Sequence, residues 1–284
     1  MKMKFSALSA LCLSAFAAMP ISASADSGHS MISNQTQAST LNTALNNGDV
    51  SWEFTDRAIG NSSGEGNALS FNGSGNALTL IGSDASGNNN SFIKPSANVS
   101  FENFSSLTLQ GRGDSSQTIF MRQPVTLSFG KSDKAIGSVT LQNLAFAAWW
   151  DGMGNDSQTA NIDFYADTLK FTGTSVNVPL SNQITINKTS AENQRTAIDG
   201  SITVGAKNAV FSVLGGSLEV DGAVSASNDG QLFLGRVEET NDLTVLNDIN
   251  LKSSLAVSTG GTALLVAENI TVAKELRVNK LYEV

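Results

Sequence analysis

Apolar side chains in this chain recur at every second position in many short segments, and not at the spacing of a helix. Residues 50–54 (Val-Ser-Trp-Glu-Phe) alternate in this way, as a strand with one buried face does. Further strand-like segments follow at 69–71, 78–80, 99–101, 107–109, 125–129, 139–141, 162–164, 169–171, 176–178, 184–186, 202–204, 211–213, 218–220 and 232–234. Beyond residues 1–25 the pattern predicts no helix, only a turn near Thr40 to Leu45. It indicates an all-β protein.

The last part of the chain repeats at a period of 21 residues, so that 243–257 recurs as 264–278. Each unit holds three apolar-x-apolar segments, which are too short to bury their apolar side chains alone and are therefore expected to stack on the next unit. This predicts a right-handed parallel β-helix with coils of about 21 residues. Looser spacing between 80 and 200 implies loops of variable length. We expect six pairs to stack: Leu243/Leu264, Val245/Val266, Ile249/Ile270, Leu251/Val272, Leu255/Leu276 and Val257/Val278.

The first 25 residues have the features of a secretory signal peptide. Lys2 and Lys4 precede an apolar stretch, and Ala23-Ser-Ala25 precedes the expected new N-terminus, Asp26. Residues 26–49 are predicted to be a polar leader or N-terminal cap, and 50–284 the β-helix. No stretch approaches the roughly 18 apolar residues of a membrane helix, so no membrane span is predicted. Cys12 is the only cysteine, so disulfides are not expected to stabilise the exported product.

Charge narrows the choice of partners. The chain carries a net charge of −8, which becomes −10 without the signal segment because that segment holds two lysines and no acid. Nucleic acids and anionic lipid surfaces are bound through clustered Lys and Arg. The acidic balance therefore argues against both.

The last repeat is followed only by residues 279–284, which leaves little to cover the interior and the edge of the final coil. Open strand edges favour further pairing. We expect either self-association through this open edge or a natural product that continues past Val284, with this chain truncated at its C-terminus.

The signal peptide, the Asn/Ser/Gly-rich body and the 21-residue strand repeat resemble the passenger region of autotransporters, the type V secreted proteins of Gram-negative bacteria. The resemblance covers residues 50–278 and implies a right-handed parallel β-helix, secreted or held at the cell surface, that acts in adhesion or self-association. Such families also carry a C-terminal membrane barrel, and nothing in this sequence corresponds to it. A chain that ends naturally here would be periplasmic.

Catalytic chemistry has little support in the sequence. The single histidine, His29, lies in the polar leader and is expected to be an exposed tail residue, while a serine triad needs a histidine base and metal sites usually draw on histidine or cysteine. We therefore predict no catalytic residues, no cofactor and no metal ion.

The densest aromatic and acidic patch spans 146–156. Trp149 and Trp150 offer flat faces for sugar rings, and Asp151 and Asp156 could accept hydrogen bonds from sugar hydroxyls. The alternative to a sugar site is that one tryptophan packs on the core, the other covers a loop, and the acids are simply solvated. Some β-helices are carbohydrate-active enzymes with paired carboxylates, and Asp151, Asp156, Asp163 and Asp167 are candidate acids on loops.

Arg112, Gly113 and Asp114, set within Gly-Arg-Gly-Asp-Ser, match the segment by which integrins recognise ligands. Recognition of this kind needs an exposed turn on which the arginine and the carboxylate are both free, because the carboxylate completes the coordination of a metal ion on the receptor. An ordinary turn has the same composition.

The preferred interpretation is a non-enzymatic, passenger-like adhesion or surface-interaction protein that engages a host-cell receptor or a surface glycan. The alternatives are a carbohydrate-active or carbohydrate-binding β-helix, and a truncated autotransporter without an independent role.

Overall fold

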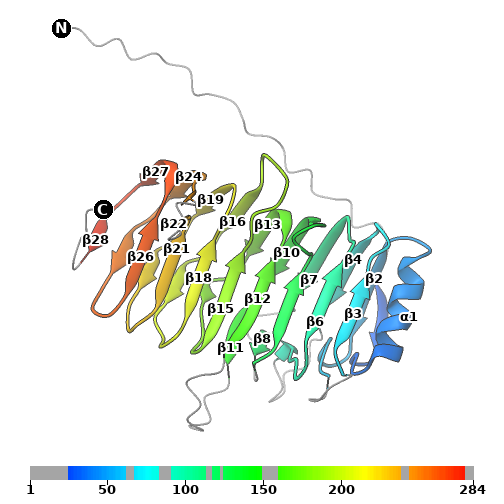
Figure 1. Ribbon diagram of the computed structural model, residues 1–284. Helices are drawn as coiled ribbons and strands as arrows, with labels where there is room; N and C mark the ends of the chain where they lie inside the picture. Colours follow the sequence, from blue (N-terminus) through cyan, green and yellow to red (C-terminus); the bar gives the residue numbers. More distant parts are fainter. Residues whose placement is uncertain are drawn as a thin grey trace, which may run out of the picture.

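The computed structural model describes residues 25–61, 67–82, 91–112, 117–121, 124–148, 159–237 and 243–278. They form stacked coils along a rod, and the parallel β-helix predicted from the sequence is confirmed (Figure 1). Residues 1–24 of the predicted signal peptide lie outside the described residues.

The strands of successive coils line up as long parallel sheets along the rod. The ten-stranded sheet is made in order of β1 (Asp26–His29), β2 (Val50–Phe54), β4 (Ala77–Ile81), β7 (Ser106–Gln110), β10 (Ile136–Gln142), β13 (Ala166–Thr172), β16 (Arg195–Ile198), β19 (Ser217–Val220), β24 (Leu246–Leu251) and β27 (Ala267–Val272). The eight-stranded sheet, in front in Figure 1, is made of β3 (Leu69–Asn72), β6 (Val99–Glu102), β9 (Thr126–Phe129), β12 (Ala160–Phe164), β15 (Asn182–Ile186), β18 (Val210–Val213), β21 (Gln231–Leu234) and β26 (Thr262–Leu265).

Shorter sheets complete the coils. A three-stranded sheet holds β5 (Ser91–Ile93), β8 (Thr118–Met121) and β11 (Ala145–Ala148), and a five-stranded sheet holds β14 (Val176–Asn177), β17 (Ile202–Val204), β20 (Val224–Ala226), β25 (Leu255–Val257) and β28 (Leu276–Val278). A separate antiparallel hairpin is formed by β22 (Arg236–Val237) and β23 (Leu243–Thr244).

Coil length varies along the rod, as the looser spacing of the middle of the sequence indicated. Paired residues are 21 apart where Ile249 meets Ile270, but 32 apart where Leu107 meets Val139 and 35 apart where Leu127 meets Ile162. Long and short coils keep parallel pairing, so the extra residues lie in the connections between strands.

The core of the rod is built from the apolar residues that alternate with polar ones along each strand. In β12, Ile162 and Phe164 are buried and Asp163 between them points outward, as the pleat of a strand requires. Stacking in register then builds ladders of like side chains. Four phenylalanines of the eight-stranded sheet stack with ring centroids 4.7 to 5.3 Å apart: Phe71, Phe101, Phe129 and Phe164.

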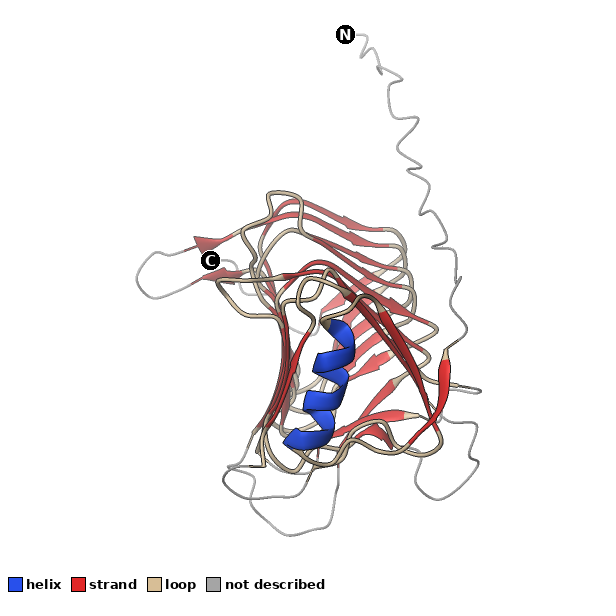
Figure 2. Cartoon of the chain, turned by 90° about the vertical axis from the view of Figure 1, so that its right-hand side faces the viewer, coloured by secondary structure: helices blue, strands red, loops and turns tan. Residues whose placement is uncertain are grey.

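One end of the rod is covered by α1 (Gln35–Leu45), which lies lengthwise across the first coils in Figure 2, where the rod is viewed along its axis. The expectation of no more than a turn in this region was wrong. The helix is mostly polar and buries only Ala38, Leu41 and Leu45, which fall on one face at helical spacing. Asn34 caps its N-terminus by accepting a hydrogen bond from the Gln37 N–H at 3.0 Å. Among the described residues no helix is long and apolar enough to cross a membrane.

Four of the six predicted stacking pairs are confirmed as register partners: Ile249/Ile270, Leu251/Val272, Leu255/Leu276 and Val257/Val278. The fifth pair, Val245/Val266, lies just before the first register partners of β24 and β27, Leu246 and Ala267. The Leu246 backbone N–H donates a hydrogen bond to the Val266 carbonyl oxygen there. The pairing of Leu243 with Leu264 was wrong. Leu243 pairs with Val237 in the hairpin, and Leu264 pairs with Phe233 of β21, because the hairpin is inserted between β21 and β24.

The coil at the other end of the rod exposes its apolar side chains. Within the described part of the chain, the exposed large hydrophobic residues are Ile270 and Leu276 in this last coil, and Leu243 and Val245 in and just after the hairpin that precedes β24. Ile270 is 47% exposed, whereas Ile249, its partner one coil earlier, is 1% exposed. The difference follows from the neighbouring coil that covers Ile249.

Candidate functional site

Arg112 of the integrin-like segment is engaged within the rod. Its guanidinium forms an ion pair with Glu53 of β2 at 2.8 Å, and its backbone N–H donates to the Gln117 side chain at 3.1 Å. The side chains of Arg112 and Glu53 are 31% and 24% exposed. Integrin recognition needs a free arginine, so this ion pair disfavours that interpretation. Gly113 and Asp114 lie outside the described residues, as do Trp149, Trp150, Asp151 and Asp156.

His29 is not the exposed tail residue expected from the sequence. It belongs to β1, stacks on Trp52 with ring centroids 3.9 Å apart, and lies 3.2 Å from the Asp26 carboxylate. Its role is to pack the first strand of the rod on the second. The part of the chain that the structure describes has no group of three or more His, Cys, Asp or Glu side chains placed to hold a metal ion.

The candidate functional site lies on the outer face of the eight-stranded sheet. Six of its eight strands contribute the polar residue between two apolar ones, and the parallel register brings these residues into line; β21 and β26 continue the line with Phe233 and Leu264. We call this line the outer row: Ser70, Ser100, Ser128, Asp163, Thr185 and Ser212. It runs along the rod, perpendicular to the strands. Short polar side chains fill it, and Asp163 is its one charged member. Ser212, at its C-terminal end, is buried and only 8% exposed.

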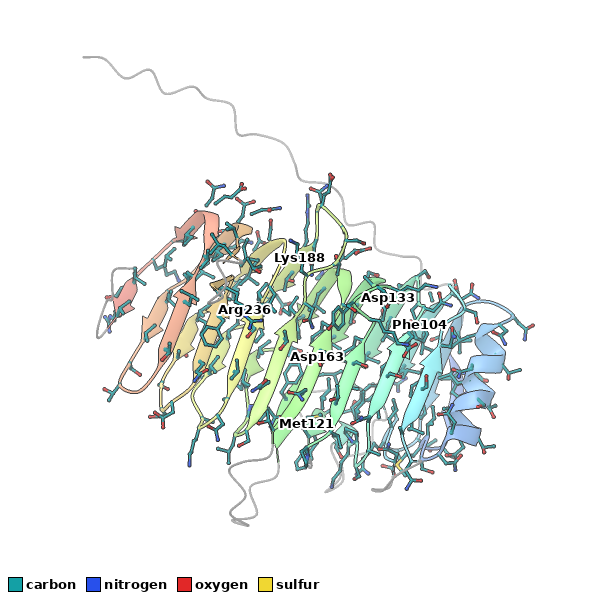
Figure 3. All side chains as sticks on the ribbon, viewed as in Figure 1. Phe104, Met121, Asp133, Asp163, Lys188 and Arg236 are labelled. Carbon is teal, nitrogen blue, oxygen red and sulfur yellow. The ribbon has the colours of Figure 1, made fainter. Side chains whose placement is uncertain are left out.

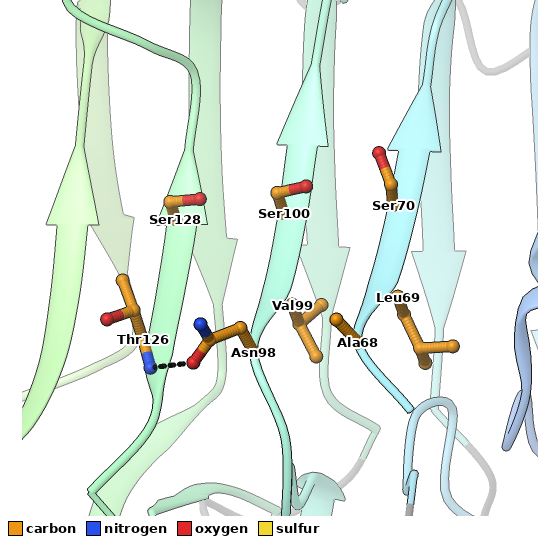
Figure 4. Close-up of a pocket in the computed structure, with 8 residues that line it drawn as sticks. All are labelled: Ala68, Leu69, Ser70, Asn98, Val99, Ser100, Thr126 and Ser128. Atoms are coloured by element: carbon orange, nitrogen blue, oxygen red, sulfur yellow. Dashed lines mark hydrogen bonds between the residues drawn. The ribbon is translucent and has the colours of Figure 1, made fainter. Parts of the chain in front are cut away.

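An open hollow of about 250 Å³ occupies the first three positions of the outer row. Ser70, Ser100 and Ser128 stand in line across neighbouring strands, with Asn98 and Thr126 beside them (Figure 4). The apolar residues Ala68, Leu69 and Val99 complete the lining. The Asn98 side chain accepts a hydrogen bond from the Thr126 backbone N–H at 2.9 Å. Among the described residues, the three serine hydroxyls have no hydrogen-bond partner. They are available to a molecule that lies in the hollow.

Directly beside this hollow, β12 and the residue after it present Asn161, Asp163 and Tyr165. Figure 3 shows Asp163 on the outer side of the eight-stranded sheet. Burial raises the pKa of the Asp163 carboxyl above its usual range, and a hydrogen bond with Asn187 opposes the shift. Burial, and next the charge of Asp163, raise the pKa of the Tyr165 phenol. The carboxyl and the phenol thus share a partly dehydrated patch.

Gly130 allows the backbone of Tyr165 to approach closely. It lies one residue beyond Phe129, the register partner of Phe164, and has a positive φ of 81°. A Cβ at this position would meet the Tyr165 carbonyl oxygen at 2.3 Å. Glycine is therefore required both by the backbone conformation and by the close approach of the next coil.

The ten-stranded sheet carries a comparable line of polar residues that includes Thr79, Thr108 and Thr140, but its chemistry differs. Further along this sheet, the outward positions hold charged side chains such as Lys170 and Glu219. Glu219 forms an ion pair with Lys252 at 2.6 Å. None of its described outward positions holds an aromatic residue. The hollow and the acid–phenol patch thus distinguish the outer row.

Two of the acids proposed from the sequence are on strands and not on loops. Asp163 lies in β12 of the eight-stranded sheet and Asp167 in β13 of the ten-stranded sheet. They belong to different sheets of the coil. The rest of the outer row was missed, although each member is the polar residue between two apolar ones.

Comparisons with family profiles, curated proteins and solved structures give no match for this chain. The geometry of the outer row therefore carries the functional proposal.

Proposed function

We propose that this protein is an exported, passenger-like surface-interaction protein whose outer row makes the contact. The observation that carries this proposal is the continuous line of small polar side chains, six coils long, beside an open hollow. A rigid rod supports this line at a fixed spacing, so many weak contacts can act together along one target. Adhesion uses this kind of extended, repeated surface.

Export is part of the same proposal. The first strand of the rod, β1, begins at Asp26, the residue that signal cleavage would make the N-terminus. Asp26 pairs in register with Trp52 of β2, so a cleaved chain can begin its coil with its first residue. N-terminal sequencing of the secreted or periplasmic protein should read Asp-Ser-Gly-His.

The experiment uses labelled protein from residue 26 onward, applied to cultured epithelial cells and to cells of the producing bacterium. Ser128→Arg places a long charged side chain in the hollow, whereas Thr108→Arg makes the matched change on the ten-stranded sheet. We expect Ser128→Arg to abolish most binding and Thr108→Arg to retain it. The proposal would be contradicted if neither the wild type nor Thr108→Arg bound to the cells, or if Ser128→Arg and Thr108→Arg bound equally well.

A carbohydrate-active enzyme is the competing function. General acid–base cleavage of a glycosidic bond needs two carboxyl groups about 5 to 10 Å apart across one groove. The two candidate acids that the structure describes, Asp163 and Asp167, belong to different sheets, which disfavours one shared groove. Reducing ends released from a polysaccharide by the purified protein would favour the enzyme.

A further inference from the structure

We propose that the outer row binds a neutral glycan chain that runs along the rod, with its best-held sugar between Asp163 and Tyr165. This inference rests on the proposed surface-interaction function and names its ligand class. The occupant would lie perpendicular to the strands, in the hollow of Ser70, Ser100 and Ser128, and would continue over β12 toward β21.

The composition of the surface matches sugar hydroxyls. Serine and threonine hydroxyls and the amides of Asn98, Asn161 and Gln183 can each donate and accept hydrogen bonds, as sugar hydroxyls do. The Asp163 carboxylate is an acceptor for two hydroxyl groups, and hydrogen bonds to a charged acceptor are the stronger ones. The patch thus supplies one strong anchor and a line of weaker contacts.

The spacing of the row matches an extended chain of sugars. Neighbouring strands lie roughly 4.8 Å apart, so each coil offers a new polar contact at that interval. This interval is close to the length of one sugar unit in an extended polysaccharide. A glycan along the row would therefore meet a polar side chain at each unit from Ser70 to Thr185, and Ser212, which is 8% exposed, would lie beneath its end.

Two aromatic residues give the row faces for sugar rings. Tyr165 follows β12 beside Gly130, and Phe233 is the register partner of Ser212 at the C-terminal end of the row. The C–H bonds of a sugar ring carry partial positive charge, and the face of an aromatic ring is negative. Phe233 lies three strands from β12, roughly 14 Å at the usual strand spacing, within reach of the same chain.

The same features disfavour other extended ligands. Asp163 is the one charge in the row, so a polyanion would meet repulsion and no cation there. An extended peptide that binds as an added strand needs a free strand edge, but every strand from β6 to β21 is paired on both sides in this sheet. A neutral, hydroxyl-rich chain is the ligand that remains favoured.

The test is titration of the protein from residue 26 onward with neutral hexasaccharides of β-linked glucose, mannose and galactose, followed by saturation-transfer NMR and calorimetry. An anionic galacturonate hexasaccharide serves as the charged comparison. We expect at least one neutral chain to bind and the anionic chain to bind more weakly. Asp163→Ala and Tyr165→Ala should each weaken binding roughly tenfold.

Asp167→Ala is the matched control, because it removes an outward acid from the adjacent ten-stranded sheet. It should bind like the wild type, and thermal unfolding of all three variants checks that they fold. The inference is overturned if no neutral chain binds, if the anion binds equally well, or if Asp167→Ala weakens binding as much as Asp163→Ala. Cell adhesion that survives these outcomes would leave the proposed function standing with another ligand.

Discussion

At the scale of single residues, most inward positions of the rod hold apolar side chains, and Thr196 is an exception. It is 2% exposed and stacks between Leu169 and Leu218, and its hydroxyl has no hydrogen-bond partner. A buried hydroxyl without a partner costs about 1 to 3 kcal/mol. Thr196→Val keeps the shape and removes this cost.

We expect Thr196→Val to raise the free energy of unfolding by about 1 kcal/mol in denaturant titrations. Thr203→Val, at an outward position of β17, is the control and should change stability little. Destabilisation by Thr196→Val would show that the hydroxyl has a partner in solution, such as a buried water.

Asp163 makes stability depend on pH in a defined direction. Burial raises its pKa in the folded protein above the ordinary value of 3.8, so the folded state holds this proton more tightly than the unfolded chain. As pH rises through the interval between these two pKa values, the wild type loses stability relative to Asp163→Asn. We expect the variant to be the more stable protein at pH 7 and the difference to vanish below pH 3.8. Thermal unfolding of both across this pH range measures it, and a difference that does not change with pH would argue against burial as the cause.

At the scale of elements, each coil is stabilised by its neighbours, so damage should spread from the less covered end. Ile249 of β24 is 1% exposed between Leu218 and Ile270. Ile249→Asp buries an unpaired carboxylate at a cost of several kcal/mol. We expect limited proteolysis to trim this variant back toward Gly235 while the N-terminal coils stay intact.

Ile270→Asp is the matched control, since the same substitution one coil later falls on a side chain that is 47% exposed. It should have a much smaller effect. Digestion of the whole Ile249→Asp rod at once would show that the coils unfold together.

The sequence predicts some of these elements and misses others. The strands were predictable because period-two alternation is local and survives in segments as short as Ile202–Val204. Helix α1 was missed because it buries only three residues in eleven, which leaves little helical period to detect. The outer row was missed because its alignment depends on register between coils. Ser128 and Asp163 are neighbours across strands but 35 residues apart, while Asp163 and Thr185 are only 22 apart, so no fixed period reveals the line.

At the scale of the whole molecule, the rod has one covered end and one open end in its described part. Helix α1 covers the first coils, while β27 and β28 end their sheets with apolar side chains exposed. An edge of this kind can pair with a second copy of itself. In an antiparallel pair of β28 strands centred on Leu276, Glu275 of each copy would face Arg277 of the other. Opposite charges at facing positions favour such a pair, and like charges oppose it.

This charge pattern gives a test of self-association through the open edge. Glu275, just before β28, and Arg277 within it form an exposed ion pair at 2.6 Å, and they can exchange partners across a twofold axis. We expect sedimentation velocity to show concentration-dependent dimers of the wild type. Arg277→Glu places like charges opposite each other twice and should weaken the dimer about tenfold at low salt, with a smaller effect at high salt. The double exchange Glu275→Arg with Arg277→Glu restores opposite charges and should restore the dimer, whereas a wild type that stays monomeric at every concentration would show that this edge is covered in another way.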